Sequence, residues 1–524
     1  MKRLAIVIAV LLVVGGIALA LLARSVLTGD NVRAAVAAQV SAAIGQPVTI
    51  GSIGASVYPR VTMDLTDVVI GQPARIQLAS VHMETGLRAL FSRRIEHAAV
   101  RVDGARITLP LPDLGSADTA APADDGALPV EIVSIEEIVL RDVEVVSGER
   151  TLRGDIELVP QGEGVQLRRV ELAADGTAID VTGALTSLSP ITGRLEAAAE
   201  SVDFDRLMAF LTDFTSRASG APASKESADL AGAATGVDGR LDIALKAVRV
   251  TTGGLALSDL AATGVVTPNA VAFDPIAFGV FGGRYDGTMH LVLEGTPQFQ
   301  WRARVAGIDT GALMAFAGSP DTVTGALSGT IALDGQGLEM EQALRTARGT
   351  ARVEIADGTI EGLGLVRTIV TATSGRGGYS ASARAAADTP GAPEAERFSR
   401  LGATWVLDRG VMATKDLSMH STDVDLTASG TIRVATMTAE FAGHVQLSEE
   451  LSKRAGTDLY RYAQEGGRVT LPVTVKGPIE NLSVNIDVGN AAMRAIRNRA
   501  AEEAKKAIER NLPGGLGGLF PKRR

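Results

Sequence analysis

The residues of this chain that could perform acid–base or metal chemistry are few and scattered. Its histidines are His82, His97, His290, His420 and His444. Metal sites and catalytic pairs place such residues at short, recognisable spacings, and no two of these histidines show one. We therefore predict surface or structural roles for all five.

Two pairs of carboxylates stand two residues apart and are the best candidates for hydrolytic or calcium chemistry. Asp203 and Asp205 form one pair, and Asp423 and Asp425 form the other. In a strand, both members of such a pair point to the same face, which is usually the solvated one. Paired-acid hydrolysis or calcium binding needs a further acid or ligand at a readable position, and the sequence shows none.

Motifs for nucleophilic catalysis and phosphate binding are also missing. The chain has no cysteine, which excludes disulfides, thiolate catalysis and zinc–thiolate sites. It has neither a G-x-S-x-G elbow nor a P-loop. The glycines Gly335, Gly337, Gly358, Gly362 and Gly364 are predicted to form turns, because none of them opens a helix after a buried strand. The sequence thus predicts a protein that is not an enzyme and holds no cofactor or metal.

Composition narrows the class of partner. With 524 residues, the chain exceeds one ordinary domain. Its net charge of -9 argues against nucleic acid, and an aromatic content of 4% is poor equipment for stacking on bases or sugars. The hydrophobic fraction of 46% comes mainly from Ala, Val, Leu and Ile, a composition that suits strands and aliphatic surfaces.

A candidate membrane anchor stands at the N-terminus. The run from Leu4 to Leu22 has 19 residues without a charge, and as a helix it would extend roughly 28 Å, about the thickness of a bilayer's hydrocarbon core. Because Lys2 and Arg3 precede it, the positive-inside tendency predicts a single-pass protein with a cytoplasmic N-terminus and its bulk outside, which in a bacterium is the periplasm. The alternative is a signal peptide cleaved near Ala20. The predicted anchor residues are Leu4, Ile6, Ile8, Leu11, Leu12, Ile17, Leu19 and Leu22.

The rest of the chain consists mainly of short strand patterns. Short helices are predicted at residues 32–44, 87–94 and 204–214, and loops at 116–126 and 373–396. We divide the chain into an anchor (1–27), an N-terminal β region (28–214), a flexible linker (215–239), a C-terminal β region (240–489) and an amphipathic helix with a glycine-rich basic tail (490–524). That last helix is interpreted either as an interfacial or partner-docking helix or as a solvated helix that covers the last sheet edge.

The strand patterns predict one apolar and one polar face. Turn-separated short strands suggest a sandwich, a barrel or a long curved sheet, and the scarcity of aromatic residues to fill a barrel favours the last. We predict a mainly β fold, in which an N-terminal transmembrane helix precedes an elongated, curved antiparallel sheet that forms a taco-like groove, with few short helices. The candidate groove residues are Leu241, Ile243, Leu245, Val424, Leu426, Leu482, Val484 and Ile486.

Such a groove would suit acyl chains. Each buried CH₂ contributes about 0.8 kcal/mol without directional bonds, so that a chain can bind and still slide. The alternative interpretation is that the same residues form an ordinary core. A charged substitution at Val484 distinguishes the two interpretations. If Val484 lines a groove, Val484→Asp should abolish lipid binding and leave the fold intact, whereas in a core it should unfold the chain.

Glycine-rich turns and strand starts recur in an ordered series. They are Val57-Tyr58-Pro59, Phe281-Gly282-Gly283-Arg284-Tyr285-Asp286-Gly287, Ala347-Arg348-Gly349-Thr350, Ala356-Asp357-Gly358-Thr359-Ile360, Phe398-Ser399-Arg400-Leu401, Asp408-Arg409-Gly410-Val411 and Leu471-Pro472-Val473. In this order, behind an N-terminal anchor, they resemble the AsmA family of bacterial envelope proteins. The resemblance implies an inner-membrane anchor, a periplasmic β-groove and a role in outer-membrane homeostasis, as in larger relatives that are regarded as lipid-carrying bridges.

Together these inferences predict an inner-membrane-anchored periplasmic protein that binds phospholipid and contributes to phospholipid transport to the outer membrane and to its homeostasis. The predicted partners are phospholipid acyl chains, the inner membrane and, further, outer-membrane or other envelope proteins, without nucleic acid. The alternative is a chaperone-like or structural factor that assists outer-membrane protein assembly by binding extended segments at a strand edge.

Overall fold

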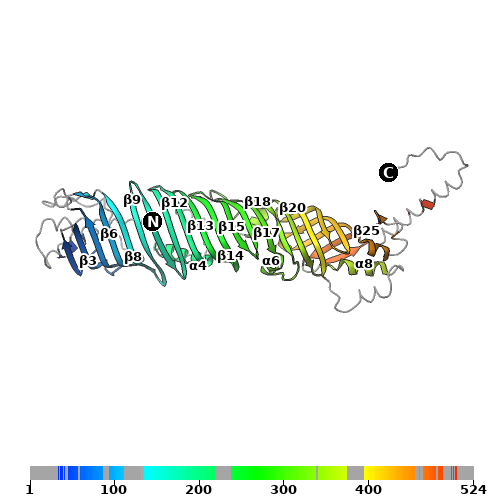
Figure 1. The fold of residues 1–524 in the computed structure, drawn as a ribbon, viewed down its shortest axis with the longest axis horizontal. Coiled ribbons are helices and arrows are strands. Elements are labelled where there is room, and N and C mark those ends of the chain that lie inside the picture. Colours follow the sequence, from blue (N-terminus) through cyan, green and yellow to red (C-terminus); the bar gives the residue numbers. More distant parts are fainter. Residues whose placement is uncertain are drawn as a thin grey trace. The chain divides into compact units, whose positions relative to one another are not determined.

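The computed structural model describes residues 45–56, 60–86, 94–110, 134–218, 238–337, 340–374, 395–454, 464–479 and 482–487, with short stretches in 33–41, 131–132, 460 and 497–503. Within these residues the chain is mainly β with few short helices, as predicted (Figure 1). It divides into two compact units, Met1–Phe278 and Gly279–Arg524, called here the N-terminal unit and the C-terminal unit. Strand β15 (Ala270–Val280) lies across their boundary.

The N-terminal unit is built from strands that pair mostly with their neighbours in sequence. Both β1 and β2 pair with β3, and β3 pairs antiparallel with β4. From β8 to β12 each strand pairs antiparallel with the next one in sequence. A further antiparallel ladder joins β13 to β14. The strands are β1 (Val48–Thr49), β2 (Ser52–Ser56), β3 (Val61–Ile70), β4 (Ile76–Thr85), β5 (Arg94–Ile95), β6 (Ala98–Thr108), β7 (Glu131–Ile132), β8 (Ile135–Ser147), β9 (Arg150–Gln161), β10 (Gly164–Ala174), β11 (Thr177–Leu188), β12 (Ile191–Asp203), β13 (Gly239–Thr252) and β14 (Leu255–Thr267).

Three strand pairs depart from the predicted antiparallel arrangement, and one of them is the separate two-stranded sheet of β5 and β7. Strands β6 and β8 are parallel, and so are β12 and β13. A parallel pair needs a crossover of a dozen or more residues, and the long segments 109–134 and 204–238 supply it. The second crossover contains helix α4 (Phe204–Ala218), which confirms the helix predicted at 204–214. Because β12 pairs with β13 on either side of it, the sheet of the N-terminal unit continues past the segment predicted to be a linker.

The part of the N-terminal unit that comes first in the sequence, from the helical stretch 33–41 to β8, has a closed core. Aliphatic side chains that alternate along β3, β4, β6 and β8 are buried together, and Val36 and Val40 of the helical stretch 33–41 pack on them. This confirms the predicted apolar face of the first short helix. Alternation in β3 and β4 is nearly strict, as expected for strands with one face in a core.

The C-terminal unit continues the same construction. From β16 to β23 each strand pairs antiparallel with the next, and β25 pairs with β23, β24 and β26. The strands are β16 (Gly283–Val292), β17 (Gln298–Asp309), β18 (Ala326–Gln336), β19 (Arg348–Ile360), β20 (Glu396–Asp408), β21 (Val411–His420), β22 (Val424–Arg433), β23 (Thr438–Leu447), β24 (Gln464–Glu465), β25 (Arg468–Pro478) and β26 (Ser483–Ile486). Short helices connect some of them: α6 (Thr310–Phe316), α7 (Met340–Thr346), α8 (Leu365–Ser374), η2 (Val434–Thr436) and α10 (Glu449–Arg454).

A second closed core, called here the C-terminal cluster, lies among β20–β26. It collects the apolar side chains of these strands and of α8, and Ile355 of β19 joins it. Helix α8 extends by two residues into the segment 373–396 that was predicted to be a loop, and Leu365 and Ile369, four residues apart, form its apolar side.

Several predicted segments lie outside the described residues. They are the candidate anchor Leu4–Leu22, residues 87–93 of the predicted helical patch and most of the C-terminal helix at 490–512. Searched within the part of the chain that the structure describes, no helix has the length and apolar character needed to span a membrane.

Candidate functional site

The middle strands of the C-terminal unit carry a face of half-buried aliphatic and aromatic side chains. Along β17 the alternate residues Phe299, Trp301 and Val305 are half-buried, whereas Gln300, Arg302 and Arg304 are exposed. The same alternation continues on β18 and β19. We call this set the open apolar face: Phe299, Trp301, Val305, Leu327, Ile331, Leu333, Ala351 and Val353.

Glycines lie opposite large side chains on the open apolar face. In the register of the sheet, Val305 is opposite Gly329 and Leu333 is opposite Gly349. A Cβ at Gly329 would lie 2.2 Å from the backbone oxygen of Arg352, so no larger residue fits there without moving the neighbouring strand. Helices α6 and α7 contact β17 and β18, which they follow in the chain, and the side chains midway along these strands stay half-exposed.

The opposite face of the same strands is charged. Arg302 pairs with Asp334 at 2.9 Å, Arg348 with Asp408 at 3.0 Å and Arg400 with Glu354 at 2.6 Å. Each pair joins neighbouring strands, and such exposed pairs contribute little to stability. They do keep one face in water, so that only the other face is available to an apolar ligand.

A hydrogen-bonded aromatic pair lies on the apolar side of β16 and β17. Trp301 Nε1 donates to Tyr285 Oη at 2.6 Å, and the rings stack with centroids 6.4 Å apart. A Cβ at Gly287 would meet Tyr285 Oη at 2.8 Å, so the phenol ring lies over the glycine. This contact explains why the Phe281–Gly287 motif combines a tyrosine at position 285 with a glycine at position 287. Burial raises the pKa of the Tyr285 hydroxyl, and the hydrogen bond from Trp301 only partly offsets this.

Aromatic rings over glycines recur in the C-terminal unit. Phe299 lies over Gly335, and Phe441 lies over Gly430 on the neighbouring strand, with a built Cβ at each glycine 2.4 Å from the ring. Rings that lie flat in this way cover backbone without filling the space above the sheet. Phe299 therefore lines the open apolar face, whereas Phe441 belongs to the buried C-terminal cluster.

The predicted groove residues of β13 lie on a comparable face of the N-terminal unit. Leu241 is buried, and Ile243 and Leu245 are half-buried. They pair with Gly193, Leu195 and Ala197 of β12. That these three side chains contact lipid stays a prediction.

The other predicted groove residues lie in the C-terminal cluster. Val424 is 0% exposed, Leu426 and Ile486 are buried, and Leu482 and Val484 pack against the cluster. Their burial favours the alternative interpretation, that they form a core in the state described. Alternation cannot separate the two cases, because a strand facing a core and a strand facing an apolar ligand have the same pattern.

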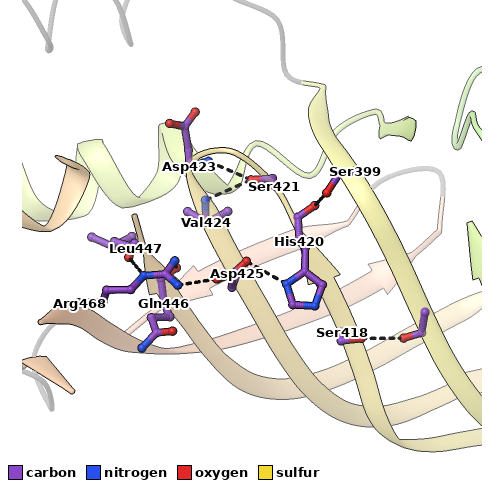
Figure 2. Close-up of polar contacts among 11 residues, drawn as sticks. Ser399, Ser418, His420, Ser421, Asp423, Val424, Asp425, Gln446, Leu447 and Arg468 are labelled. Atoms are coloured by element: carbon purple, nitrogen blue, oxygen red, sulfur yellow. Dashed lines mark hydrogen bonds and ion pairs between the residues drawn. The ribbon is translucent and has the colours of Figure 1, made fainter. Parts of the chain in front are cut away.

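A polar cluster lies at one end of β21–β25 (Figure 2). Arg468 donates to Asp425 at 2.6 Å and to the backbone oxygen of Leu447 at 2.7 Å, while His420 Nδ1 lies 3.0 Å from Asp425 Oδ1. Partial burial opposes ionisation of Asp425, but the hydrogen bonds from Arg468 and His420 outweigh it and lower the pKa of that carboxyl. The cluster joins four strands.

This cluster lacks the geometry of a nucleophile and its base. The nearby hydroxyls of Ser399 and Ser418 donate to the backbone oxygens of His420 and Gly402 at 3.1 and 3.4 Å. His82 forms a comparable exposed pair with Asp64. Among the described residues, no three acidic or histidine side chains are grouped as metal ligands.

The carboxylate pairs of the sequence have local structural partners. Asp203 accepts a hydrogen bond from the Arg206 amide at 3.0 Å and so caps α4. Asp205 accepts from the Gly253 amide at 2.7 Å and fastens α4 to the turn after β13. Asp425 belongs to the polar cluster described above.

A buried carboxylate was not singled out from the sequence. Glu396, at the start of β20, is 7% exposed and accepts a hydrogen bond from the Val366 amide of α8 at 3.3 Å. Burial raises the pKa of Glu396, and the charge of Asp423 adds to this, although the amides of Val366 and Leu365 act in the other direction.

Comparison with known proteins gives one family match. A family model described as the AsmA family matches residues 199–417, which include all of β16–β19. Searches of curated proteins and of solved structures found no match.

Proposed function

We propose that this chain, an AsmA-like protein, binds phospholipid by laying its acyl chains on the open apolar face, and that it is not an enzyme. The observation that carries the proposal is that β17–β19 keep aliphatic side chains half-exposed on one face while charged pairs occupy the other. Contiguous apolar surface in water favours association with an apolar ligand. The family match and the mainly β architecture fit a family of bridge-like lipid transport proteins.

The chemistry of the face sets the kind of binding. The open apolar face offers Val, Leu, Ile and aromatic side chains and few hydrogen-bonding groups, and the indole N–H of Trp301 is already donated to the Tyr285 hydroxyl. Each CH₂ of an acyl chain buried there contributes about 0.8 kcal/mol, and no directional bond fixes its position. An acyl chain can therefore move along the face, with its head group in water.

The proposal includes the location of the chain in the cell. The uncharged run Leu4–Leu22 would anchor the chain in the inner membrane, with the β units in the periplasm. There the chain would contribute to phospholipid transport to the outer membrane and to its homeostasis. What supports this is the N-terminal sequence together with the family match.

Photo-crosslinking tests lipid binding directly. The purified full-length chain is incubated with vesicles of phosphatidylcholine that carries a diazirine in one acyl chain, irradiated and mapped by mass spectrometry. We expect label on Trp301, Ile331 or Val353, and none on the outward Arg302 or Arg304 of the same strands. The outward residues are the matched control, because they share backbone, peptide and solvent.

Two outcomes contradict the proposal. Label spread equally over both faces would indicate non-specific contact with vesicles, and a fully folded but unlabelled chain would exclude acyl-chain binding at this face. If an unlabelled chain instead co-purifies with extended outer-membrane protein segments, the alternative of an assembly factor gains support.

A further inference from the structure

Helix α8 is a separable part of the C-terminal cluster. The strands of this region are held to one another by their own ladders, from β20–β21 through β25–β26. Helix α8 adds no strand to them. It packs through apolar side chains, with Leu365 and Ile369 (1% exposed) in the cluster, and it contacts β26. Displacement of α8 would therefore leave every ladder hydrogen bond of these strands in place.

The connection between β19 and α8 can act as a hinge. It contains Gly362 at φ 73° and Gly364 at φ 46°, in the left-handed region that glycine adopts at low cost. The Glu361 amide donates to the Thr322 oxygen at 3.0 Å, which fastens the chain just before these glycines. A rotation at residues 362–364 would thus move α8 without disturbing β19.

The N-terminal end of α8 is held by the buried Glu396. This carboxylate accepts from the Val366 amide at 3.3 Å, next to the positive end of the helix dipole. Burial of Glu396 at 7% exposure opposes its ionisation, and this desolvation cost offsets part of what the cap contributes to holding α8. Helix α8 therefore depends largely on apolar packing to stay on the cluster.

The open apolar face and the apolar side chains of the C-terminal cluster belong to the same side of one sheet. Ala351 of the open apolar face pairs with Trp405 of β20, which packs against the C-terminal cluster. Val353 also packs against the cluster. The apolar side chains of β18 and β19 thus continue, strand by strand, into those of β20–β22.

We propose that the apolar surface that the strands of the C-terminal cluster share with α8, including Val424, Leu426 and Ala428 of β22, is a second acyl-chain-binding site, which α8 helps to close in this structure. The inference rests on the proposed function, because it uses the same ligand class on the same side of the sheet. When α8 moves away, an acyl chain takes its place on the aliphatic side chains. The predicted groove residues of β22 then contact lipid only in this opened state.

The test weakens α8 and uses the open apolar face as internal standard. The full-length Ile369→Ala variant and the unaltered chain are photo-crosslinked with the diazirine phosphatidylcholine vesicles. We expect labelling of the β22 peptide to rise at least about tenfold, because removing a buried aliphatic side chain weakens packing by more than that factor. Labelling of the β18 peptide should stay unchanged. The control is Arg367→Ala, on the exposed side of the same helix.

The outcomes separate this inference from the proposed function. Label on β18 but unchanged labelling of β22 in Ile369→Ala overturns the inference and leaves the proposed function intact. An absence of label on β18 in every sample overturns both.

Hydrogen exchange on the unaltered full-length chain is a second test of the inference, and it needs no variant. We expect the amides of Thr368 and Ile369 to exchange much faster than those of Leu426 and Val445, because α8 opens while the strands stay paired. Equal exchange rates with the same denaturant dependence would mean that α8 leaves only on unfolding, and would overturn the inference even if Ile369→Ala fails to fold.

Discussion

Trp301 Nε1 donates a hydrogen bond of 2.6 Å to Tyr285 Oη, and the two rings stack nearly parallel at an angle of 14°. The bond joins β16 to β17 on the apolar side of the sheet. It also satisfies the indole nitrogen, so that a tryptophan can line an apolar face without leaving a buried donor unpaired.

Tyr285→Phe removes the acceptor and keeps the ring. We expect a loss of about 1–3 kcal/mol in the free energy of unfolding, because the Trp301 donor is left unsatisfied in a half-buried place. Chemical denaturation followed by Trp301 fluorescence, with Trp405→Phe as background, measures it. No change in the midpoint would mean that Trp301 finds another acceptor at no cost.

Gly287→Ala tests the space under the tyrosine ring. The added Cβ would meet Tyr285 Oη at 2.8 Å and the backbone oxygen of Arg302 at 2.3 Å, so we expect destabilisation of about 1–3 kcal/mol by overpacking. Gly402→Ala is the matched control, because its Cβ has only an ordinary contact of 3.5 Å with the Val353 oxygen. Thermal unfolding compares the two. Equal midpoints would show that the Tyr285 ring lies elsewhere.

Ile331→Asp and Val424→Asp should have different effects. Ile331 is half-exposed on the open apolar face, so we expect its carboxylate to reach water, the fold to persist and acyl-chain binding to fall. Val424 is fully buried, so an unpaired charge there should cost several kcal/mol and unfold the C-terminal cluster. Quenching of Trp301 by phosphatidylcholine with brominated acyl chains reports binding, and circular dichroism reports the fold. An Ile331→Asp variant that retains full quenching would contradict lipid binding at this face.

Glu396→Gln should stabilise the chain at neutral pH. The pKa of Glu396 is raised mainly by burial, so its ionised form is disfavoured in the folded state, and the stability tied to its protonated form is lost as pH rises through the folded pKa. The glutamine carries no charge and still accepts from the Val366 amide. We expect the gain in melting temperature to shrink as pH falls. A gain that is independent of pH would contradict a buried, titrating Glu396.

Asp425→Asn should reduce stability at neutral pH but not in acid. The pKa of Asp425 is lowered, so its contribution is present above the unfolded pKa and is lost as pH falls through the folded one. We expect a loss of roughly 1 kcal/mol, between that of a surface pair and that of a buried one. Asp408→Asn, at an exposed pair with Arg348, should change little. Urea unfolding at pH 7 and pH 3 measures the difference in the free energy of unfolding between Asp425→Asn and the unaltered chain. A difference that persists at pH 3 would contradict this prediction.

The alternation of apolar and polar residues was enough to predict a mainly β chain, because a strand exposes successive side chains to opposite faces whatever lies beyond them. The helix at 204–214 and the apolar face of Val36 and Val40 followed from local sequence in the same way. Turns with positive φ angles, such as Phe281-Gly282 at 47° and 71°, were indicated in the sequence by their glycines.

Only the tertiary structure decided which apolar faces are closed. Val424 and Ile331 sit in the same alternating pattern, yet α8 and the neighbouring strands bury one and leave the other half-exposed. Parallel pairing of β12 with β13 and the burial of Glu396 against α8 depend on segments tens of residues apart, which no local period encodes. Periodicity determines the face on which a side chain lies, and long-range packing determines what covers that face.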